Sequence, residues 1–317
     1  MAIYLSESDV DALADMELAL ASVESSMARQ GRGTSSNVGR RRARIKSGAL
    51  NLMGAADEEL GVAGAKLYSA FPGGSTRFVV ILFDIITGSL QAVIEAGRLG
   101  ELRTGAATGI ATKYLARENS SIVGLIGSGR QARTQLLAIH HLQTISEVRV
   151  WSRNPSNVET FVRDMRPQLD APINKARTAS EAISGADIVV TATSAATPVI
   201  DASNLVNGMH VTAMGSNNPR HTELSPDAIA AVDRVFVDDL DGAHEECGDL
   251  IVATQAGQFQ WGQATELGRV VAGEIEGRTT TNQITLFESQ GIALWDIALA
   301  HAIVQRAESK NRGTRIG

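Results

Sequence analysis

The sequence predicts an α/β protein that combines a parallel-sheet domain with a second, smaller α+β domain. Three observations favour this class. From Ser121 onward, short apolar segments alternate with helical segments, which is typical of a parallel sheet covered by helices on both faces. A glycine-rich turn joins the first of these apolar segments to a helix. The first half of the chain instead has short apolar runs punctuated by glycine, which indicates strands and turns.

The first half is expected to begin and end with helices. Apolar residues recur at helical spacing from Ser8 to Gln30, with Ser8 as the expected cap. Strands joined by tight turns are expected from about Arg40 to Ala92, with Pro72-Gly73-Gly74 among the turns. A helix with a small-residue face then follows over Leu99–Ala116.

The second half is expected to supply the strands of the parallel sheet. These strands are predicted at Ile122–Ile126, Val148–Trp151, Ile188–Ala192, Val211–Met214 and Val235–Val237. A last helix is expected over Ile292–Glu308. We therefore expect residues 117–294 to form the parallel-sheet domain, and residues 1–116 together with 295–317 to form the other.

The composition is that of an ordinary globular protein, with 317 residues, 44% of them hydrophobic. A net charge of −6 argues against a general binder of nucleic acids or membrane surfaces. The acidic first turns are unlike a secretory leader, and the longest apolar run, Phe78 to Phe83, is too short to span a bilayer. The single cysteine, Cys247, excludes an internal disulfide and is not part of a zinc-binding spacing, so we expect a cytoplasmic protein without a metal.

The glycine-rich turn has the spacing G-x-G-x-x-A between a predicted strand and a predicted helix. Gly127 would permit the tight turn, Gly129 would let a diphosphate approach the backbone, and Ala132 would let the helix pack closely on the sheet. Free amide groups at the start of the helix favour an anion. The sequence therefore predicts a Rossmann-type site for a nicotinamide dinucleotide, the alternative being an ordinary glycine turn. The candidate cofactor-binding residues of the loop are Gly127, Ser128, Gly129, Arg130, Gln131 and Ala132.

The strand after this loop ends without an acidic residue. NAD sites usually place Asp or Glu there to bind the ribose 2′-hydroxyl group. This chain has Ser152, Arg153 and Asn154 instead. These residues could bind a 2′-phosphate, with Arg153 as the cation, so we favour NADPH over NADH. The alternative is that Arg153 stacks on the adenine, which NAD also permits.

Two later strands are predicted to end in small polar residues. Thr191 and Thr193 end one of them, and Gly215 and Ser216 follow the other. Because ligands of open parallel sheets bind beyond the carboxyl ends of the strands, we expect these residues to line the nicotinamide half of the site. The alternative is that both threonines are strand residues whose hydroxyl groups bond within the protein.

Four segments together resemble the ornithine cyclodeaminase/mu-crystallin family. They are Gly64-Ala-Lys66, Leu99-Gly-Glu-Leu-Arg103-Thr-Gly-Ala-Ala-Thr-Gly109, the loop Gly127–Ala132 and Phe287-Glu-Ser-Gln-Gly-Ile-Ala-Leu-Trp-Asp296. The resemblance covers almost the whole chain, with the segments in the family's order. It implies an NAD(P)-dependent enzyme that forms a homodimer through the sheet of its first domain.

The resemblance also implies a substrate with an α-carboxylate beside an amine or imine carbon. It assigns Arg40, Lys66 and Arg103 to that carboxylate and places Thr104 at the cofactor, and three cations around a carboxylate suit this role. Alternatives remain for the two arginines. Arg42 or Arg44 could be the inward member of the run that contains Arg40, and Arg103 could form a surface ion pair with Glu101. Asp296 is expected either to contact the cofactor or to cap its helix.

The chain departs from the cyclodeaminase pattern at one position. Where cyclodeaminases and archaeal alanine dehydrogenases of the family have an aspartate that assists proton transfer, this chain has Asn217. An amide cannot take up a proton at neutral pH and can only orient a partner. Reduction of an imine asks less of the protein, because the cofactor supplies the hydride. Lys66 or a water could supply the proton, while Asn217 orients the nitrogen.

We therefore expect an NAD(P)H-dependent imine (ketimine) reductase that makes an amino acid from a small α-imino acid. The imine could be cyclic, such as pyrroline-2-carboxylate, or acyclic, such as iminosuccinate. A second carboxylate would suit the additional cations Arg41, Arg42, Arg44, Arg220 and His221, although surface exposure explains them equally well. Three alternatives are a redox-neutral cyclodeaminase, an alanine-dehydrogenase-type enzyme and a non-catalytic binding protein. A metal site at His244, Glu245, Glu246 and Asp249 is not expected.

Overall fold

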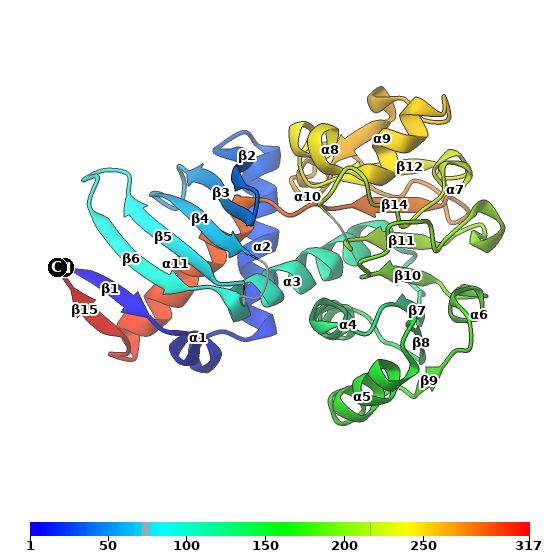
Figure 1. Ribbon diagram of the computed structural model, residues 1–317, viewed down its shortest axis with the longest axis horizontal. Coiled ribbons are helices and arrows are strands. Elements are labelled where there is room, and N and C mark those ends of the chain that lie inside the picture. Colours follow the sequence, from blue (N-terminus) through cyan, green and yellow to red (C-terminus); the bar gives the residue numbers. More distant parts are fainter. Residues whose placement is uncertain (72–75, 216) are drawn as a thin grey trace. The chain divides into compact units, whose positions relative to one another are not determined.

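The computed structural model describes residues 1–71, 76–215 and 217–317. The chain folds into two compact units (Figure 1). One unit comprises Met1–Ala106 and Ile292–Gly317, and the other comprises Ala107–Gly291. Helix α3 (Gly97–Leu115) belongs partly to each. The predicted boundaries lay after residues 116 and 294, and the assignment of substrate and cofactor to separate domains stays a prediction.

The first unit is built on a seven-stranded sheet with the order β15-β1-β6-β5-β4-β3-β2. Its strands are β1 (Ala2–Leu5), β2 (Ser35–Ile45), β3 (Gly48–Asp57), β4 (Val62–Ala70), β5 (Phe78–Asp84), β6 (Leu90–Glu95) and β15 (Thr314–Ile316). Strands β2 to β6 form a continuous antiparallel meander, as the hairpin pattern predicts. The predicted turn at Pro72-Gly73-Gly74 lies outside the described residues.

The helix predicted from Ser8 to Gln30 is wrong as a single element. The chain forms α1 (Glu7–Leu13) and α2 (Met16–Gly31) instead. The extended backbone of Asp15 interrupts them, and its carboxylate accepts a hydrogen bond from the amide of Leu18 at 2.8 Å. Ser6, not Ser8, caps the first helix, in a reciprocal arrangement with Asp9. Each helix therefore begins at its own polar cap, which apolar spacing alone did not reveal.

The C-terminal helix α11 (Ala293–Ser309), predicted over Ile292–Glu308, packs against strands β2 to β5 and against α2. Side chains of one face of the sheet are buried beneath it. At Gly64, any side chain would overlap the carbonyl oxygen of Ile81 and approach Ile297 of α11. On the other face, Leu50, Leu52 and Phe83 are exposed. The unit therefore has one covered and one uncovered sheet face.

The second unit is a parallel sheet with the order β13-β12-β14-β11-β10-β7-β8-β9. Its strands are β7 (Ile122–Ile126), β8 (Glu147–Trp151), β9 (Ile173–Lys175), β10 (Ile188–Thr191), β11 (His210–Ala213), β12 (Arg234–Val237), β13 (Ala264–Glu266) and β14 (Thr285–Glu288). The five predicted strands are confirmed to within a residue at each end. The prediction missed β9 and β13, which have three residues each and are too short to show a pattern of their own. It also missed β14, although this strand has four residues, as the predicted β10 does.

Helices follow most strands of this sheet. They are α4 (Arg130–Leu142), α5 (Pro155–Met165), α6 (Ala179–Ile183), α7 (Pro226–Ala230), α8 (Leu240–Glu246), α9 (Gly248–Gln255) and α10 (Leu267–Val271), with single 3₁₀ turns at Arg166–Gln168, Ala202–Asn204 and Trp261–Gln263. Val123 and Leu125 of β7 join an apolar cluster with α4 and α5, whereas Ile126 joins one with α6, α7 and α9. Both faces of the sheet are therefore buried, as the alternating pattern predicts. Among the described residues, no helix has the length and apolar character needed to cross a membrane.

Candidate functional site

The glycine loop of the second unit has the geometry that its spacing predicts. Gly127 has a φ of 116°, and a side chain there would overlap the carbonyl oxygen of Ala192. Gly129 is the N-cap residue of α4 and has open space where a side chain would stand. Ala132 is fully buried against the sheet. The start of α4 is therefore bare and its amide groups have no side-chain cap, which suits a diphosphate.

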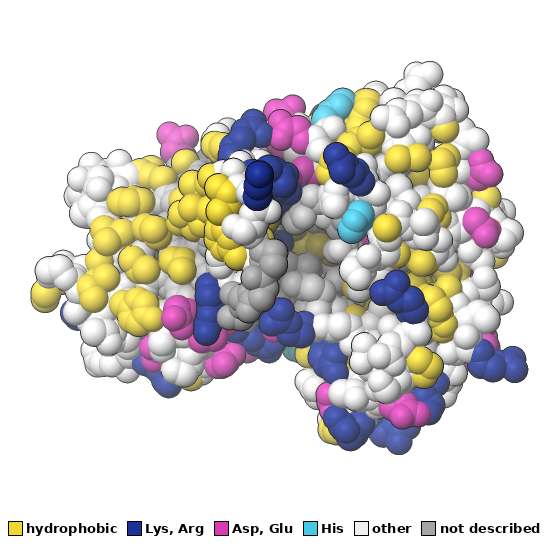
Figure 2. Space-filling view, viewed as in Figure 1, with side chains coloured by type: hydrophobic (Ala, Val, Ile, Leu, Met, Phe, Trp, Pro, Cys, Tyr) yellow, Lys and Arg dark blue, Asp and Glu magenta, His cyan; other side chains and the backbone are white. Residues whose placement is uncertain are grey.

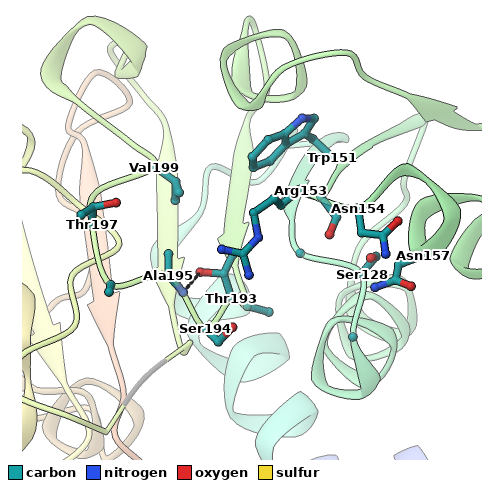
Figure 3. A pocket seen from close by; sticks show the side chains of 15 residues that line it. Ser128, Trp151, Arg153, Asn154, Asn157, Thr193, Ser194, Ala195, Thr197 and Val199 are labelled. Carbon is teal, nitrogen blue, oxygen red and sulfur yellow. Dashed lines mark hydrogen bonds between the residues drawn. The ribbon is translucent and has the colours of Figure 1, made fainter.

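A cavity of about 380 Å³ lies beside this loop, at the carboxyl ends of β7, β8 and β10 (Figure 3). The predicted cofactor residues that line it are Gly127, Ser128, Gly129, Ser152, Arg153, Asn154 and Thr193. Arg130, Gln131, Ala132, Thr191 and Gly215 belong to the same unit but are not part of this lining. Ser216 lies outside the described residues.

Arg153 is the one cation among the described residues of the lining, and none of these residues carries a carboxylate. Figure 3 shows its guanidinium extending from the end of β8 toward Thr193 on the opposite wall. Asn154 is less available, because its side-chain oxygen accepts hydrogen bonds from Ser156 at the start of α5. A phosphate or an adenine ring in the cavity would therefore meet Arg153.

A buried carboxylate that sequence reasoning missed holds the ends of two neighbouring strands. Glu223 accepts hydrogen bonds from the Thr191 hydroxyl at 2.7 Å and from the amide of Gly215 at 2.9 Å. It also accepts from the amide and the hydroxyl of Thr193, at 2.9 and 2.6 Å. Both threonine hydroxyls are therefore satisfied within the protein, which was the alternative interpretation of these residues.

Two more buried carboxyl groups lie near Glu223. Asp249 accepts from the amides of Glu223 and Leu224, at 2.7 and 2.9 Å. The pKa of Asp249 is raised to about 7, chiefly by burial and also by the charge of Glu223, against hydrogen bonds that include one with Glu288. Burial and the charges of Asp249 and Glu223 raise the pKa of Glu288 well above its usual range. Burial also raises the pKa of Glu223, against the hydrogen bonds that it accepts. The environment therefore favours the protonated form of Glu288, whereas Asp249 titrates near neutral pH.

A second candidate site lies in the first unit, around Asp296 of α11. Oδ1 of Asp296 accepts from Lys66 Nζ of β4 at 2.7 Å and from Arg103 Nε of α3 at 3.2 Å. All three side chains are buried. Arg103 thus pairs with Asp296, and Glu101, its alternative partner, pairs with Arg98 at 3.4 Å. Asp296 is therefore a partner of two predicted substrate-binding cations. The sequence had suggested instead that it contacts the cofactor or caps its helix.

Arg40 is the inward member of its arginine run. It is 6% exposed, whereas Arg42 is half-buried and Arg41 and Arg44 are exposed. The pKa of Lys66 is lowered to about 8 by burial and by the charges of Arg103 and Arg40, against the opposing effect of Asp296. Arg40 and Arg103 thus both act electrostatically on Lys66 within the first unit.

Four predicted residues are less informative. Thr104 is buried, and its hydroxyl donates to the carbonyl oxygen of Gly100 at 2.8 Å. Asn217 is half-buried in the stretch after β11. Of the cations predicted for a second carboxylate, Arg220 is exposed and His221 is half-buried. Nothing in their geometry assigns them to a substrate.

The parallel sheet, the bare helix start after Gly129 and the adjoining cavity define a Rossmann-type dinucleotide-binding protein. The buried cluster of Lys66, Arg103 and Asp296 belongs to a second unit of different topology. The chain belongs to the ornithine cyclodeaminase/mu-crystallin family, whose model matches residues 2–311. The resemblance in the four sequence segments is thereby confirmed.

Relatives and solved structures of the family agree with this assignment. The chain is 37% identical over 239 residues to a Delta(1)-pyrroline-2-carboxylate reductase of Bacillus cereus, covering 75% of this chain and 73% of the relative. It is 32% identical over 234 residues to an iminosuccinate reductase of Paracoccus denitrificans, covering 73% and 71%.

Two solved structures superpose on nearly the whole chain. The Delta(1)-pyrroline-2-carboxylate reductase of Thermococcus litoralis, in complex with NADH and L-proline, has a TM-score of 0.94 at 32% identity and covers 99% of this chain and 100% of that chain. An archaeal alanine dehydrogenase dimer with bound NAD also has a TM-score of 0.94 at 32% identity, and covers 100% and 99%. These two similarities extend to both units of the chain.

Proposed function

We propose that this protein is an NAD(P)H-dependent imine reductase that converts a small α-imino acid into an amino acid. The observation that carries the proposal is that Lys66 and Arg103, both buried, share a single oxygen of Asp296. Two cations with one carboxylate between them retain a positive charge, and a substrate carboxylate would balance it. Reductases of imino acids among the relatives support the same substrate class.

The residues present fit a nicotinamide dinucleotide. The start of α4 is open beside Gly129, and the cavity next to it has a cation and, among its described lining residues, no carboxylate. In the proposed function, the backbone amides of this loop bind the diphosphate. The coenzyme supplies the hydride when it is bound. We favour NADPH because Arg153 would meet a 2′-phosphate, whereas NADH or NAD is bound in the solved relatives.

Lys66 is the proposed proton donor. A pKa of about 8 leaves its ammonium group largely protonated at neutral pH, yet able to release a proton to the imine nitrogen. Asp296 Oδ1 holds the ammonium in place and raises its pKa. Arg40 and Arg103 would bind the substrate carboxylate, and Asn217 would orient the nitrogen without exchanging a proton. This division of roles needs no aspartate at position 217.

We also propose that the protein is a cytoplasmic homodimer formed through the uncovered sheet face of the first unit. Apolar side chains gather on that face in Figure 2. Rows such as Leu52, Leu67 and Val79 lie side by side across β3, β4 and β5. Contiguous apolar patches of this kind commonly mark protein interfaces. The solved archaeal alanine dehydrogenase is a dimer, which supports the same assembly.

A coenzyme-oxidation assay tests the proposed activity. Purified protein would be mixed with NADPH or NADH and a panel of imines, including pyrroline-2-carboxylate, piperideine-2-carboxylate, and pyruvate or oxaloacetate with ammonia. We expect loss of reduced coenzyme with at least one imine and formation of the matching amino acid. Lys66→Met should abolish that loss while Lys175→Met, which alters an exposed lysine, should not. No oxidation with any imine, or ammonia release from ornithine without net coenzyme change, would contradict the proposal.

A further inference from the structure

Glu223 is the residue that joins the wall of the cofactor cavity to the ends of the central strands. The segment from Thr193 to Ile200 leaves β10 and supplies much of that wall, and Figure 3 shows Thr193, Ser194, Ala195, Thr197 and Val199 along it. Both ends of this segment bond to Glu223. Its carboxylate accepts from the amide and hydroxyl of Thr193. Its backbone carbonyl oxygen accepts from the amides of Val199 and Ile200, at 2.8 and 3.0 Å.

The other oxygen of the carboxylate reaches two strand ends. It accepts from the hydroxyl of Thr191, the last residue of β10, and from the amide of Gly215, which follows β11. A side chain at Gly215 would overlap this carboxylate, so the glycine and the glutamate fit only as a pair. The Thr193 hydroxyl in turn accepts from the amide of Ala195 at 3.0 Å and fixes the first turn of the wall. One side chain therefore ties both strand ends to the cavity wall.

The backbone of Glu223 is itself held by a neighbouring carboxylate. Asp249 Oδ1 accepts from the amides of Glu223 and Leu224, and Glu223 is 2% exposed. A carboxylate with four donors and a fixed backbone has one accessible orientation, which a neutral amide cannot reproduce because its nitrogen does not accept hydrogen bonds. Losing two acceptor sites would leave donors unsatisfied either at Thr193, which lines the cavity, or at Thr191 and Gly215, at the strand ends.

We propose that Glu223 is a positioning residue for the coenzyme, which holds the Thr193–Ile200 wall and the Thr191 and Gly215 strand ends in their binding geometry. The inference rests on the proposed function, because it concerns the coenzyme that this function uses. In this role Glu223 acts through the residues that it holds and not by binding substrate or coenzyme itself. Substitution of Glu223 should therefore change coenzyme affinity more than affinity for the imine.

The test compares Glu223→Gln with Asp187→Asn. Asp187 is a matched control because it also ties strand ends of the sheet, but at their amino ends, by accepting from the amides of Ser121 and Ile122 and pairing with Arg117. Binding of NADH and NADPH would be measured by fluorescence titration, together with the KM for each substrate. We expect Glu223→Gln to raise the coenzyme Kd and KM at least fivefold with an unchanged KM for the imine. Asp187→Asn should lower the Tm while leaving the coenzyme Kd within twofold of the unsubstituted protein.

A second pair of variants keeps the test decisive if Glu223→Gln does not fold. Thr193→Val removes one donor to the carboxylate and should raise the coenzyme Kd. Thr193→Ser retains the hydroxyl group, so its coenzyme Kd should be lower than that of Thr193→Val. Where the double variant Glu223→Gln/Thr193→Val folds, its effect should be smaller than the product of the single effects. Coenzyme Kd values within twofold of the unsubstituted protein for both Glu223→Gln and Thr193→Val would overturn the inference. Failure of the unsubstituted protein to bind any coenzyme would instead reject the proposed function.

Discussion

Lys66 and Asp296 form a buried ion pair of 2.7 Å between β4 and α11, and the same carboxylate oxygen also binds Arg103. The second oxygen of Asp296, Oδ2, is buried without a hydrogen-bond partner among the described residues. One oxygen of this carboxylate therefore binds two cations from different elements, while the other oxygen is an acceptor without a donor among the described residues. The pair sets how strongly Lys66 holds its proton, which makes the activity depend on pH.

The first prediction concerns that pH dependence. Lys66 has a lowered pKa of about 8, so its protonated form is lost as the pH rises through that value, well below the 10.5 of an ordinary lysine. We expect kcat/KM for the imine to fall above about pH 8. Asp296→Asn removes the charge that raises the pKa of Lys66, so the alkaline fall should move to lower pH. A pH profile of each protein measures this, and an unshifted profile in Asp296→Asn would contradict it.

The second prediction separates the arginines of β2. Arg40 is buried near Lys66, whereas Arg44 is exposed. A hydrogen bond to a charged group contributes about 1.5–3 kcal/mol, so Arg40→Gln should raise the KM for the imine about tenfold or more. Arg44→Gln is the matched control and should change it less than about twofold. Steady-state kinetics measure the KM of each variant. Equal effects of the two substitutions would contradict the assignment of Arg40 to the substrate carboxylate.

The third prediction distinguishes the two coenzymes. Arg153 extends into the cavity beside the glycine loop. If it binds a 2′-phosphate, Arg153→Ala should weaken NADPH binding about tenfold or more and leave NADH binding nearly unchanged, because only NADPH carries that group. Calorimetric titration with each coenzyme measures both affinities. An equal loss for both coenzymes would instead indicate stacking on the adenine.

The fourth prediction tests the homodimer. Leu52 is 39% exposed on the uncovered face of the first unit, and burial of such a side chain in an interface would not tolerate a charge. We expect Leu52→Glu to convert the dimer into monomers with little loss of thermal stability in each subunit. Val206→Glu is the control, since Val206 is 47% exposed in the other unit. Light scattering after gel filtration gives the mass, and a monomeric unsubstituted protein would reject the proposed dimer.

Part of the candidate site could be predicted because its signal is local. The turn from Gly127 to Ala132 needs small residues at fixed spacing, and strand and helix on either side of it are periodic in sequence. The inward arginine could not be predicted in this way. Strict alternation along β2 would place Arg40 on the same face as the exposed Val38. A register shift between Val38 and Arg41 breaks this alternation, so Arg40 faces inward.

By itself, the sequence determined the α/β class, the dinucleotide loop and, through its resemblance to a family, the cations Lys66 and Arg103. The tertiary structure alone decided that the carboxylate of Asp296 binds these cations and that the carboxylate of Glu223 binds the strand ends. Asp296 is separated from Lys66 by 230 residues, and Glu223 lies 32 residues beyond Thr191. Such partners have no fixed spacing, because they are brought together by the packing of elements rather than by the periodicity of one element.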